Sequence, residues 1–149
     1  MEWTKENYTI TTDQSKINVA FVQQFLSRSY WAENIPAEIV QRSIGGSLCF
    51  AVFHKQEQVG FARVITDAAT FAYLADVFID EAWRGKGLSR WLMEVIISHP
   101  SLQGLRRFLL ATRDAHGLYS KFGFTPLKDT APWMQIHVPG VYKEVKTPS

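Results

Sequence analysis

Residues 72–96 read Ala72-Tyr-Leu-Ala-Asp-Val-Phe-Ile79, Asp80-Glu-Ala-Trp-Arg84-Gly-Lys-Gly-Leu-Ser89 and Arg90-Trp-Leu-Met-Glu-Val-Ile96. The first part is rich in the aromatic and branched residues that are typical of a strand. The second part is a short basic loop that contains Gly85 and Gly87. The third part repeats apolar residues at the spacing of one helix face. A strand, a glycine loop and a helix start in this order predict a site for phosphate or pyrophosphate.

Two common phosphate-binding loops do not fit this sequence. A P-loop needs a glycine five residues before a Gly-Lys-Ser/Thr run, but Asp80 takes that position and Gly87 follows Lys86. The dinucleotide-binding fingerprint needs a small residue three places after Gly87, where this chain has Arg90. The structural alternative is a glycine turn surrounded by solvated basic side chains.

Two motifs resemble those of one known family. The loop Arg84-Gly-Lys-Gly87-Leu-Ser89 is similar to the Arg/Gln-x-x-Gly-x-Gly/Ala signature of the GNAT superfamily of acetyl-CoA-dependent N-acetyltransferases. Downstream, Ala115-His-Gly-Leu-Tyr119-Ser-Lys-Phe-Gly123-Phe124 resembles the family's Ala-x-x-x-Tyr-x-x-x-Gly-Phe segment. The resemblance covers residues 48–128 or so. Its departure in the loop is Ser89, where the family usually has glycine or alanine.

The hydrophobic pattern predicts a mixed α/β (α+β) fold. Strands are expected over residues 8–12, 48–54, 59–66, 71–79, 106–112, 124–127 and 133–138, and helices from residue 15, over 37–43, after Gly87 and over 114–122. The resemblance implies the same order: a mostly antiparallel, twisted sheet of six to seven strands, flanked by about four helices. It also implies that the fourth and fifth strands are splayed apart. Since no linker or repeat divides residues 1–149, we expect a single domain of this type.

The resemblance also implies where the coenzyme binds. In the family, backbone amides and basic side chains of the glycine loop hold the pyrophosphate of coenzyme A. The corresponding residues here are Arg84, Gly85, Lys86, Gly87, Leu88, Ser89 and Arg90. The pantetheine arm would lie between the splayed strands and bond to the backbone of Val77, Phe78 and Ile79. The family often has an asparagine seven residues before its motif tyrosine; this chain has Thr112, whose hydroxyl replaces only part of a carboxamide.

Tyr119 is the expected general acid, because the motif tyrosine of the family lies near the coenzyme sulfur and protonates the departing thiolate. A phenol with an ordinary pKa of about 10 keeps its proton at neutral pH and can donate it to such a leaving group. The structural alternative is a tyrosine that packs its ring beneath a helix. The base that takes the amine proton is expected to be Asp76, with Glu81 and His116 as reserves.

The acceptor pocket of the family is usually shaped by the loop between the first two helices and by the late strand hairpin. The resemblance therefore implies Tyr30, Trp31 and Glu33 as substrate-binding residues, with Trp133 and His137 as candidates from the hairpin. Aromatic residues would suit an aromatic or apolar amine, although they suit core packing equally well.

Composition argues against several other functions. A net charge of +2 over 149 residues gives no basic surface for nucleic acid, and no apolar run is long enough to cross a membrane. The one cysteine, Cys49, lies in an apolar run and suits a buried thiol rather than a nucleophile. The four histidines lack ligand spacing, so no metal is expected. The N-terminal residues lack the pattern of a signal peptide, which favours the cytoplasm.

These features together predict an enzyme that transfers an acetyl group from acetyl-CoA to the primary amine of a small molecule, by direct attack in a ternary complex. Two other functions fit the same sequence: a non-catalytic acyl-CoA-binding sensor or partner module, and an N-acetyltransferase of proteins or peptides. Homodimers are common in the family, so a homodimer is a further expectation from the resemblance.

Overall fold

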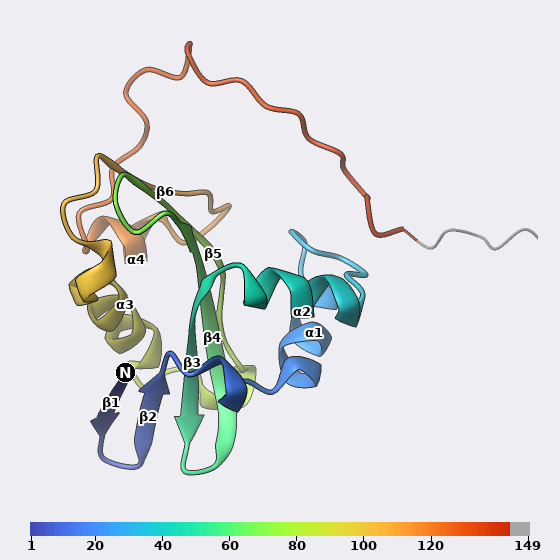
Figure 1. The fold of residues 1–149 in the computed structure, drawn as a ribbon, viewed down its shortest axis with the longest axis vertical. Coiled ribbons are helices and arrows are strands. Elements are labelled where there is room, and N and C mark those ends of the chain that lie inside the picture. The colour runs from blue at the N-terminus through green and yellow to red at the C-terminus, as the bar shows by residue number, and fades with distance from the viewer. Residues whose placement is uncertain (144–149) are drawn as a thin grey trace, which may run out of the picture.

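The computed structural model describes residues 1–143. One six-stranded sheet forms its centre, and the strands lie side by side in the order of the sequence (Figure 1). They are β1 (Glu2–Lys5), β2 (Tyr8–Thr11), β3 (Leu48–His54), β4 (Glu57–Thr66), β5 (Phe71–Ile79) and β6 (Arg107–Leu110). All neighbours are antiparallel except β5 and β6, which are parallel. The predicted mixed, mostly antiparallel sheet is therefore confirmed.

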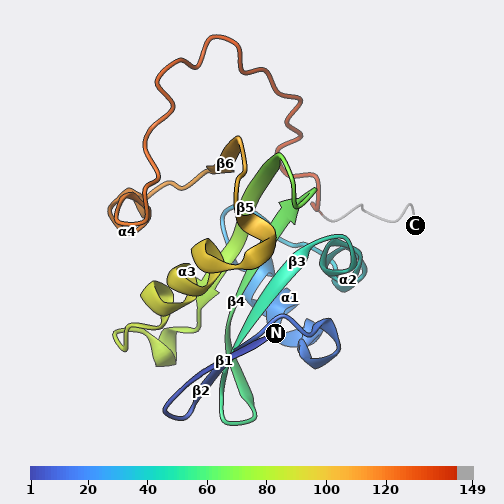
Figure 2. The same cartoon turned by 60° about the vertical axis from the view of Figure 1, so that its left-hand side comes forward.

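Within residues 1–143, four α-helices flank the sheet. They are α1 (Val19–Ser27), α2 (Ala37–Gly45), α3 (Leu88–Ser98) and α4 (His116–Ser120). Figures 1 and 2 show α1 and α2 on one face, α3 on the other, and α4 beyond β6. Helix α3 provides the crossover that a parallel strand pair requires, because β5 and β6 cannot be joined by a tight turn.

Side-chain alternation along the strands divides the core into two clusters. In β3, Phe50 and Val52 pack in the cluster that contains α3, whereas Cys49 and Ala51 pack in the cluster that contains α1 and α2. This is the period of two that a strand buried on both faces imposes. Apolar burial of both faces therefore holds the two helical layers against one sheet.

The parallel strands separate after four paired residues. The pairs run from Phe71 with Arg107 to Leu74 with Leu110, after which β5 continues to Ile79 without a partner on that side. Because β5 and β6 are the fourth and fifth strands of the sequence prediction, the predicted splay is confirmed. It creates a gap in backbone pairing beside the last residues of β5.

The two final predicted strands do not form. Residues 124–127 and 133–138 belong to neither a strand nor a helix, so the prediction of a late hairpin is wrong. Pro126 removes a backbone N–H that the first of these strands would need, and Pro132 and Pro139 flank the second. The segment leaves the body beyond α4 and arches over the end of the sheet (Figures 1 and 2).

Candidate active site

A β-bulge on β5 lies where this strand parts from β6. Phe61 of β4 pairs with Phe78, but Arg63 pairs with Ala75, so two residues of β5 stand opposite one of β4. One of the two is Asp76, whose φ of 54° is left-handed. Backbone of this kind is strained for a residue other than glycine, and bulges commonly redirect a side chain at functional sites. The bulge turns Asp76 toward the layer of α1 and α2, where it meets two partners.

The Asp76 carboxylate accepts two side-chain hydrogen bonds. Oδ2 accepts from Nε of Arg63, and Oδ1 accepts from Nε1 of Trp31, each at 2.8 Å. Arg63 also donates from Nη1 to the Ser47 hydroxyl at 3.1 Å. The ion pair is largely shielded, since the Arg63 and Asp76 side chains are only 16% and 9% exposed. Asp76 is the acceptor in both contacts.

The loop between α1 and α2 reaches across the splay. Trp31 is tied to β5 through Asp76, while the hydroxyl of its neighbour Tyr30 accepts from the backbone N–H of Arg113 at 3.2 Å. The Arg113 guanidinium also lies over the Tyr30 ring, 3.8 Å from its centroid. Arg113 follows β6, so two adjacent aromatic residues connect the two strands that separate. Glu33 lies exposed in the same loop.

The glycine loop has the geometry of an anion-binding site. Gly85 and Gly87 both have φ of 78°, and a Cβ added at either would meet no atom within 4 Å. The N-cap of α3 is Gly87, and no side chain caps this helix. Within residues 1–143, the backbone N–H groups of residues 85 to 90 donate to no protein acceptor. They are therefore free to bind an anion at the positive end of the helix dipole.

Basic side chains surround these amides in different ways. Arg84 donates from Nε to the carbonyl of Ile79 at 3.1 Å, which fastens the loop to the end of β5. On the exposed face of α3, Nε of Arg90 lies 3.8 Å from Oε1 of Glu94. The Lys86 side chain is also exposed. Leu88 is buried in the core, so only its backbone faces the loop. Ser89, the departure from the family signature, is half-buried at the start of α3.

The end of β5 presents backbone groups to the splay. The N–H of Asp80 donates to the Val59 carbonyl on β4 at 2.8 Å. Because successive residues of a strand point in opposite directions, the N–H of Ile79 faces away from β4, toward the gap. The Phe78 ring is in the core and stacks on the Phe25 ring, with 3.8 Å between the ring centroids. Val77 packs against the core cluster that contains α3. The side chains of Phe78 and Ile79 therefore pack in the core, and the N–H of Ile79 faces the gap.

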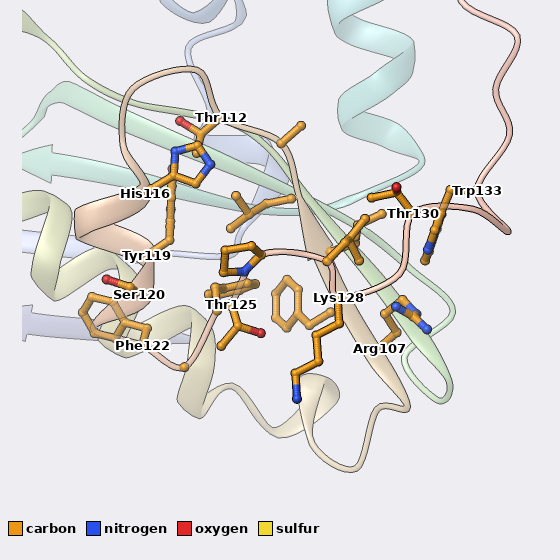
Figure 3. A pocket seen from close by; sticks show the side chains of 18 of the residues that line it. Arg107, Thr112, His116, Tyr119, Ser120, Phe122, Thr125, Lys128, Thr130 and Trp133 are labelled. Atoms are coloured by element: carbon orange, nitrogen blue, oxygen red, sulfur yellow. The ribbon is translucent and has the colours of Figure 1, made fainter.

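Tyr119 of α4 lines a cavity of about 1280 Å³ and is itself only 9% exposed. Burial raises the pKa of its phenol, and nearby Tyr30 and Asp114 raise it further. Figure 3 shows Tyr119 with Thr112 and His116 at one end of the cavity, and Arg107 and Trp133 at the other.

Thr112 shapes the turn that leads to this helix. Its hydroxyl oxygen accepts from the backbone N–H of Ala115 at 3.1 Å, and its side chain lines the same cavity. The hydroxyl proton remains available as one donor, whereas an asparagine would offer two. Thr112 therefore contributes both to the local backbone and to the cavity wall.

Two residues of the site were absent from the sequence prediction. Arg63 pairs with Asp76, and Arg113 packs on Tyr30. Arg63 could have been found, because a lone arginine between Ala62 and Val64 in an apolar strand needs a buried acidic partner. No comparable signal in the sequence marks Arg113.

Other reactive groups in the described chain suit structural roles. Burial raises the pKa of the Cys49 thiol to about 12, so this cysteine stays protonated at neutral pH. Among residues 1–143, no three histidine, cysteine or acidic side chains are grouped so that they could hold a metal ion. In the same residues, no helix is both long and apolar enough to pass through a bilayer.

Comparisons with known proteins agree with the fold and with both motifs. A family model described as an acetyltransferase (GNAT) domain matches residues 45–126. A Gibberella zeae protein, provisionally named an acetyltransferase, is 32% identical and the match covers 80% of this chain and 79% of that protein.

Solved structures of similar proteins include a GNAT-family crystal structure from Xanthomonas campestris pv. campestris, provisionally described as an acetyltransferase. It is 49% identical, with a TM-score of 0.90 over 92% of this chain and 97% of that chain. A more distant structure from Clostridium acetobutylicum, described as an acetyltransferase with acetyl-CoA, is 14% identical. Its TM-score is 0.62 over 88% of this chain and 95% of that chain, a likeness of fold.

Proposed function

This chain belongs to the GNAT family of acetyltransferases, and we propose that it transfers an acetyl group from acetyl-CoA to the primary amine of a small molecule. One observation carries the proposal: the unpaired amides of residues 85 to 90 follow, after one short turn, the end of β5 that has lost β6 as a neighbour. Free amides at a helix start can bind a diphosphate, and an open strand edge can pair with an extended arm that contains amides. A ligand that carries both groups needs these two features next to each other. The acetyl-CoA described in the Clostridium acetobutylicum relative supports the choice of donor.

The glycine loop would hold the pyrophosphate through its backbone. The open space above Gly85 and Gly87 admits a ligand close to the main chain, and the N–H groups of Leu88, Ser89 and Arg90 point from the first turn of α3. Lys86 and the guanidinium groups of Arg84 and Arg90 would add charge. Thr112 offers one hydroxyl donor at the other end of the gap.

The splay would accept the pantetheine arm as an additional strand beside β5. Backbone groups of Val77, Phe78 and Ile79 would bond its amides. The N–H of Ile79 is directed toward the gap, while the Ile79 carbonyl already accepts from Arg84. Acetyl-CoA, when bound, supplies an activated thioester. A backbone N–H aimed at the thioester oxygen would stabilise the charge that develops there, and one such donor is commonly worth about 3 kcal/mol.

Proton transfer would involve Tyr119 and Asp76. The amine nitrogen forms the new bond to the acetyl carbon while the carbon–sulfur bond breaks, and the Tyr119 phenol gives its proton to the leaving sulfur. A phenol whose pKa is raised by burial keeps that proton at neutral pH. The Asp76 carboxylate takes the proton that the amine loses, directly or through water, and it already accepts from two donors at the bulge.

The acceptor would bind beside Tyr30 and Trp31. Because this aromatic pair connects β5 to the segment after β6, it leaves an aromatic wall on the acceptor side of the splay. Such a wall favours a small amine with a flat or apolar body over a folded protein surface. The exposed carboxylate of Glu33 in the same loop would attract the ammonium form of the amine.

A thiol-release assay tests the proposal. The protein is mixed with acetyl-CoA and a panel of small primary amines, with peptide amines as a second panel, and free coenzyme thiol is followed with time. We expect release that depends on a small amine and yields the N-acetylated product. Tight acetyl-CoA binding without turnover on either panel would instead indicate a non-catalytic binding module.

A further inference from the structure

The guanidinium group of Arg113 stacks on an aromatic ring but has no acidic partner. Its Cζ lies 3.8 Å from the centroid of the Tyr30 ring, and the backbone N–H of Arg113 donates to the Tyr30 hydroxyl at 3.2 Å. Within residues 1–143, the guanidinium donates no hydrogen bond and forms no ion pair. The ring therefore restrains the plane of the guanidinium, while the N–H donors around its edge stay available.

Tyr30 and Trp31 connect this cation to a carboxylate. The two rings meet edge to face with 5.1 Å between their centroids, and the Trp31 indole donates to Asp76 at 2.8 Å. Tyr30 is 50% exposed and Trp31 is 43% exposed. Because Asp76 is already paired with Arg63, Arg113 is the cation of this group that lacks an acidic partner in the described chain. An exposed aromatic surface therefore ends at an unpaired guanidinium.

This arrangement suits a planar anion. A guanidinium binds a carboxylate through two parallel N–H···O hydrogen bonds, and a ring that already holds the guanidinium reduces the freedom lost on binding. The diphosphate of the coenzyme has its own proposed site at the amides of residues 85 to 90. Arg113 instead follows β6 and contacts the loop between α1 and α2, on the side where the acceptor is proposed to bind. The anion that suits Arg113 is therefore a group on the acceptor.

We propose that the acceptor amine carries a carboxylate and that Arg113 binds it. The inference rests on the proposed function and narrows its substrate class from small primary amines to amino acids in the broad sense, with the carboxylate on any carbon. The flat or apolar body of the substrate lies along Tyr30 and Trp31, and its amine faces the splay. Arg113 is then a residue that determines specificity, because it recognises the substrate without taking part in proton transfer.

Pairs of ligands that differ only in the carboxylate test the proposal. Phenylalanine is compared with phenethylamine, and para-(aminomethyl)benzoate with benzylamine. Calorimetry on the full chain with coenzyme A present measures each affinity, so no turnover is needed. We expect the acid of at least one pair to bind about 10-fold or more tightly than its amine, because it gains a bidentate, charge-assisted contact. Equal or weaker binding of the acid in both pairs, or no detectable binding of either acid, would overturn the proposal.

Variants of Arg113 separate recognition from a structural role. Arg113→Gln should abolish the preference for the acid and leave the affinity of the plain amine nearly unchanged. Arg113→Lys keeps the charge but loses the planar fork, so we expect it to retain only part of the preference. Arg42→Gln removes one positive charge from an exposed position on α2 and should keep the full preference. Equal losses for acid and amine in Arg113→Gln would show that Arg113 only holds Tyr30 in place, which overturns the proposal.

The affinity for coenzyme A shows whether the anion belongs to the acceptor. We expect Arg113→Gln to leave that affinity nearly unchanged. If a coenzyme phosphate occupied the guanidinium instead, Arg113→Gln would weaken coenzyme binding and leave the acid preference intact, and the proposal would fail. Failure of the proposed function appears in a different measurement, as an absence of thiol release with every amine. Turnover of plain amines without any preference for acids would reject the present inference alone.

Discussion

The indole Nε1 of Trp31 donates a hydrogen bond to Oδ1 of Asp76 across 2.8 Å, although the two residues are 45 positions apart in the chain. The other carboxylate oxygen accepts from Arg63, so one side chain joins the α1–α2 loop to β4 and β5. This contact occurs at the bulge, just after β5 has lost β6 as a neighbour. The α1–α2 loop and the gap between β5 and β6 therefore share one anchoring point, Asp76.

Trp31→Phe removes the indole donor while it keeps an aromatic ring in the loop. We expect kcat/KM for the amine to fall about 10-fold or more. Without the hydrogen bond to Asp76 the aromatic ring of residue 31 can move, and the amine is then held less well in position to attack. The affinity for acetyl-CoA should be unchanged, since the loop amides are untouched. Steady-state kinetics with the amine as variable substrate measures the effect, and Trp3→Phe in β1 is the matched control. Equal losses in both variants would contradict a role for Trp31 in acceptor binding.

Asp76→Asn keeps the shape of the side chain and an oxygen acceptor but cannot take a proton. If Asp76 is the base, kcat/KM should fall about 100-fold or more, and the acid limb of its pH profile should change. Glu38→Gln, an exposed acid on α2, serves as the control. Lower thermal stability with an unchanged acid limb would show instead that the carboxylate only holds Arg63 and Trp31 in place.

Tyr119→Phe removes the phenol proton and leaves the ring packing. We expect kcat to fall about 100-fold or more while acetyl-CoA binding stays close to that of the wild type, because the lost group acts on the leaving sulfur. Measuring both kcat and the coenzyme dissociation constant separates a loss of proton transfer from a loss of coenzyme binding. Tyr8→Phe in β2 is the control, and little loss of kcat in Tyr119→Phe would reduce Tyr119 to a packing residue.

The pH dependence of kcat follows from the direction of the Tyr119 shift. Burial raises the pKa of this phenol, so its acid form persists to higher pH than that of a free tyrosine at about 10. We therefore expect no falling limb attributable to Tyr119 below about pH 10. The same sign means that any stability contributed by the neutral phenol is present below its unfolded pKa and is lost as pH rises through its folded pKa. A falling limb in wild-type kcat near neutrality that is absent in Tyr119→Phe would contradict this role.

Gly87→Glu places a side chain and a negative charge at the start of α3. We expect acetyl-CoA binding to be lost, because the new carboxylate opposes the pyrophosphate and the left-handed backbone disfavours any residue with a Cβ. Calorimetric titration measures the affinity. Gly104→Glu is the matched control, since Gly104 also has a positive φ of 71° and open space around it but lies before β6. Unchanged affinity in Gly87→Glu would refute the loop assignment.

Much of the fold could be predicted because local patterns and tertiary packing agree. The predicted strands 48–54 and 71–79 have the bounds of β3 and β5, since both are apolar runs that end at turn residues. The expected glycine loop before a helix also formed, and the helix begins within the motif, at Leu88. The pattern missed β1, whose polar side chains are mostly exposed and give little periodic signal.

The site was less predictable because its geometry depends on contacts between distant residues. Strand alternation could not reveal that the bulge gives Asp76 a left-handed backbone, nor that Arg63 and Trp31 meet its carboxylate. The apolar alternation at Met134 and Ile136 did indicate a strand. That segment finds no backbone partner in the described chain, which shows that alternation alone does not make a strand without a hydrogen-bonded neighbour.

A crystal structure of the chain with coenzyme A tests the proposed mechanism most directly. The predicted result is a diphosphate within hydrogen-bond distance of the N–H groups of residues 85 to 90, with the coenzyme sulfur beside the Tyr119 hydroxyl. A coenzyme bound outside the gap between β5 and β6, or a Tyr119 hydroxyl out of reach of the sulfur, would contradict it.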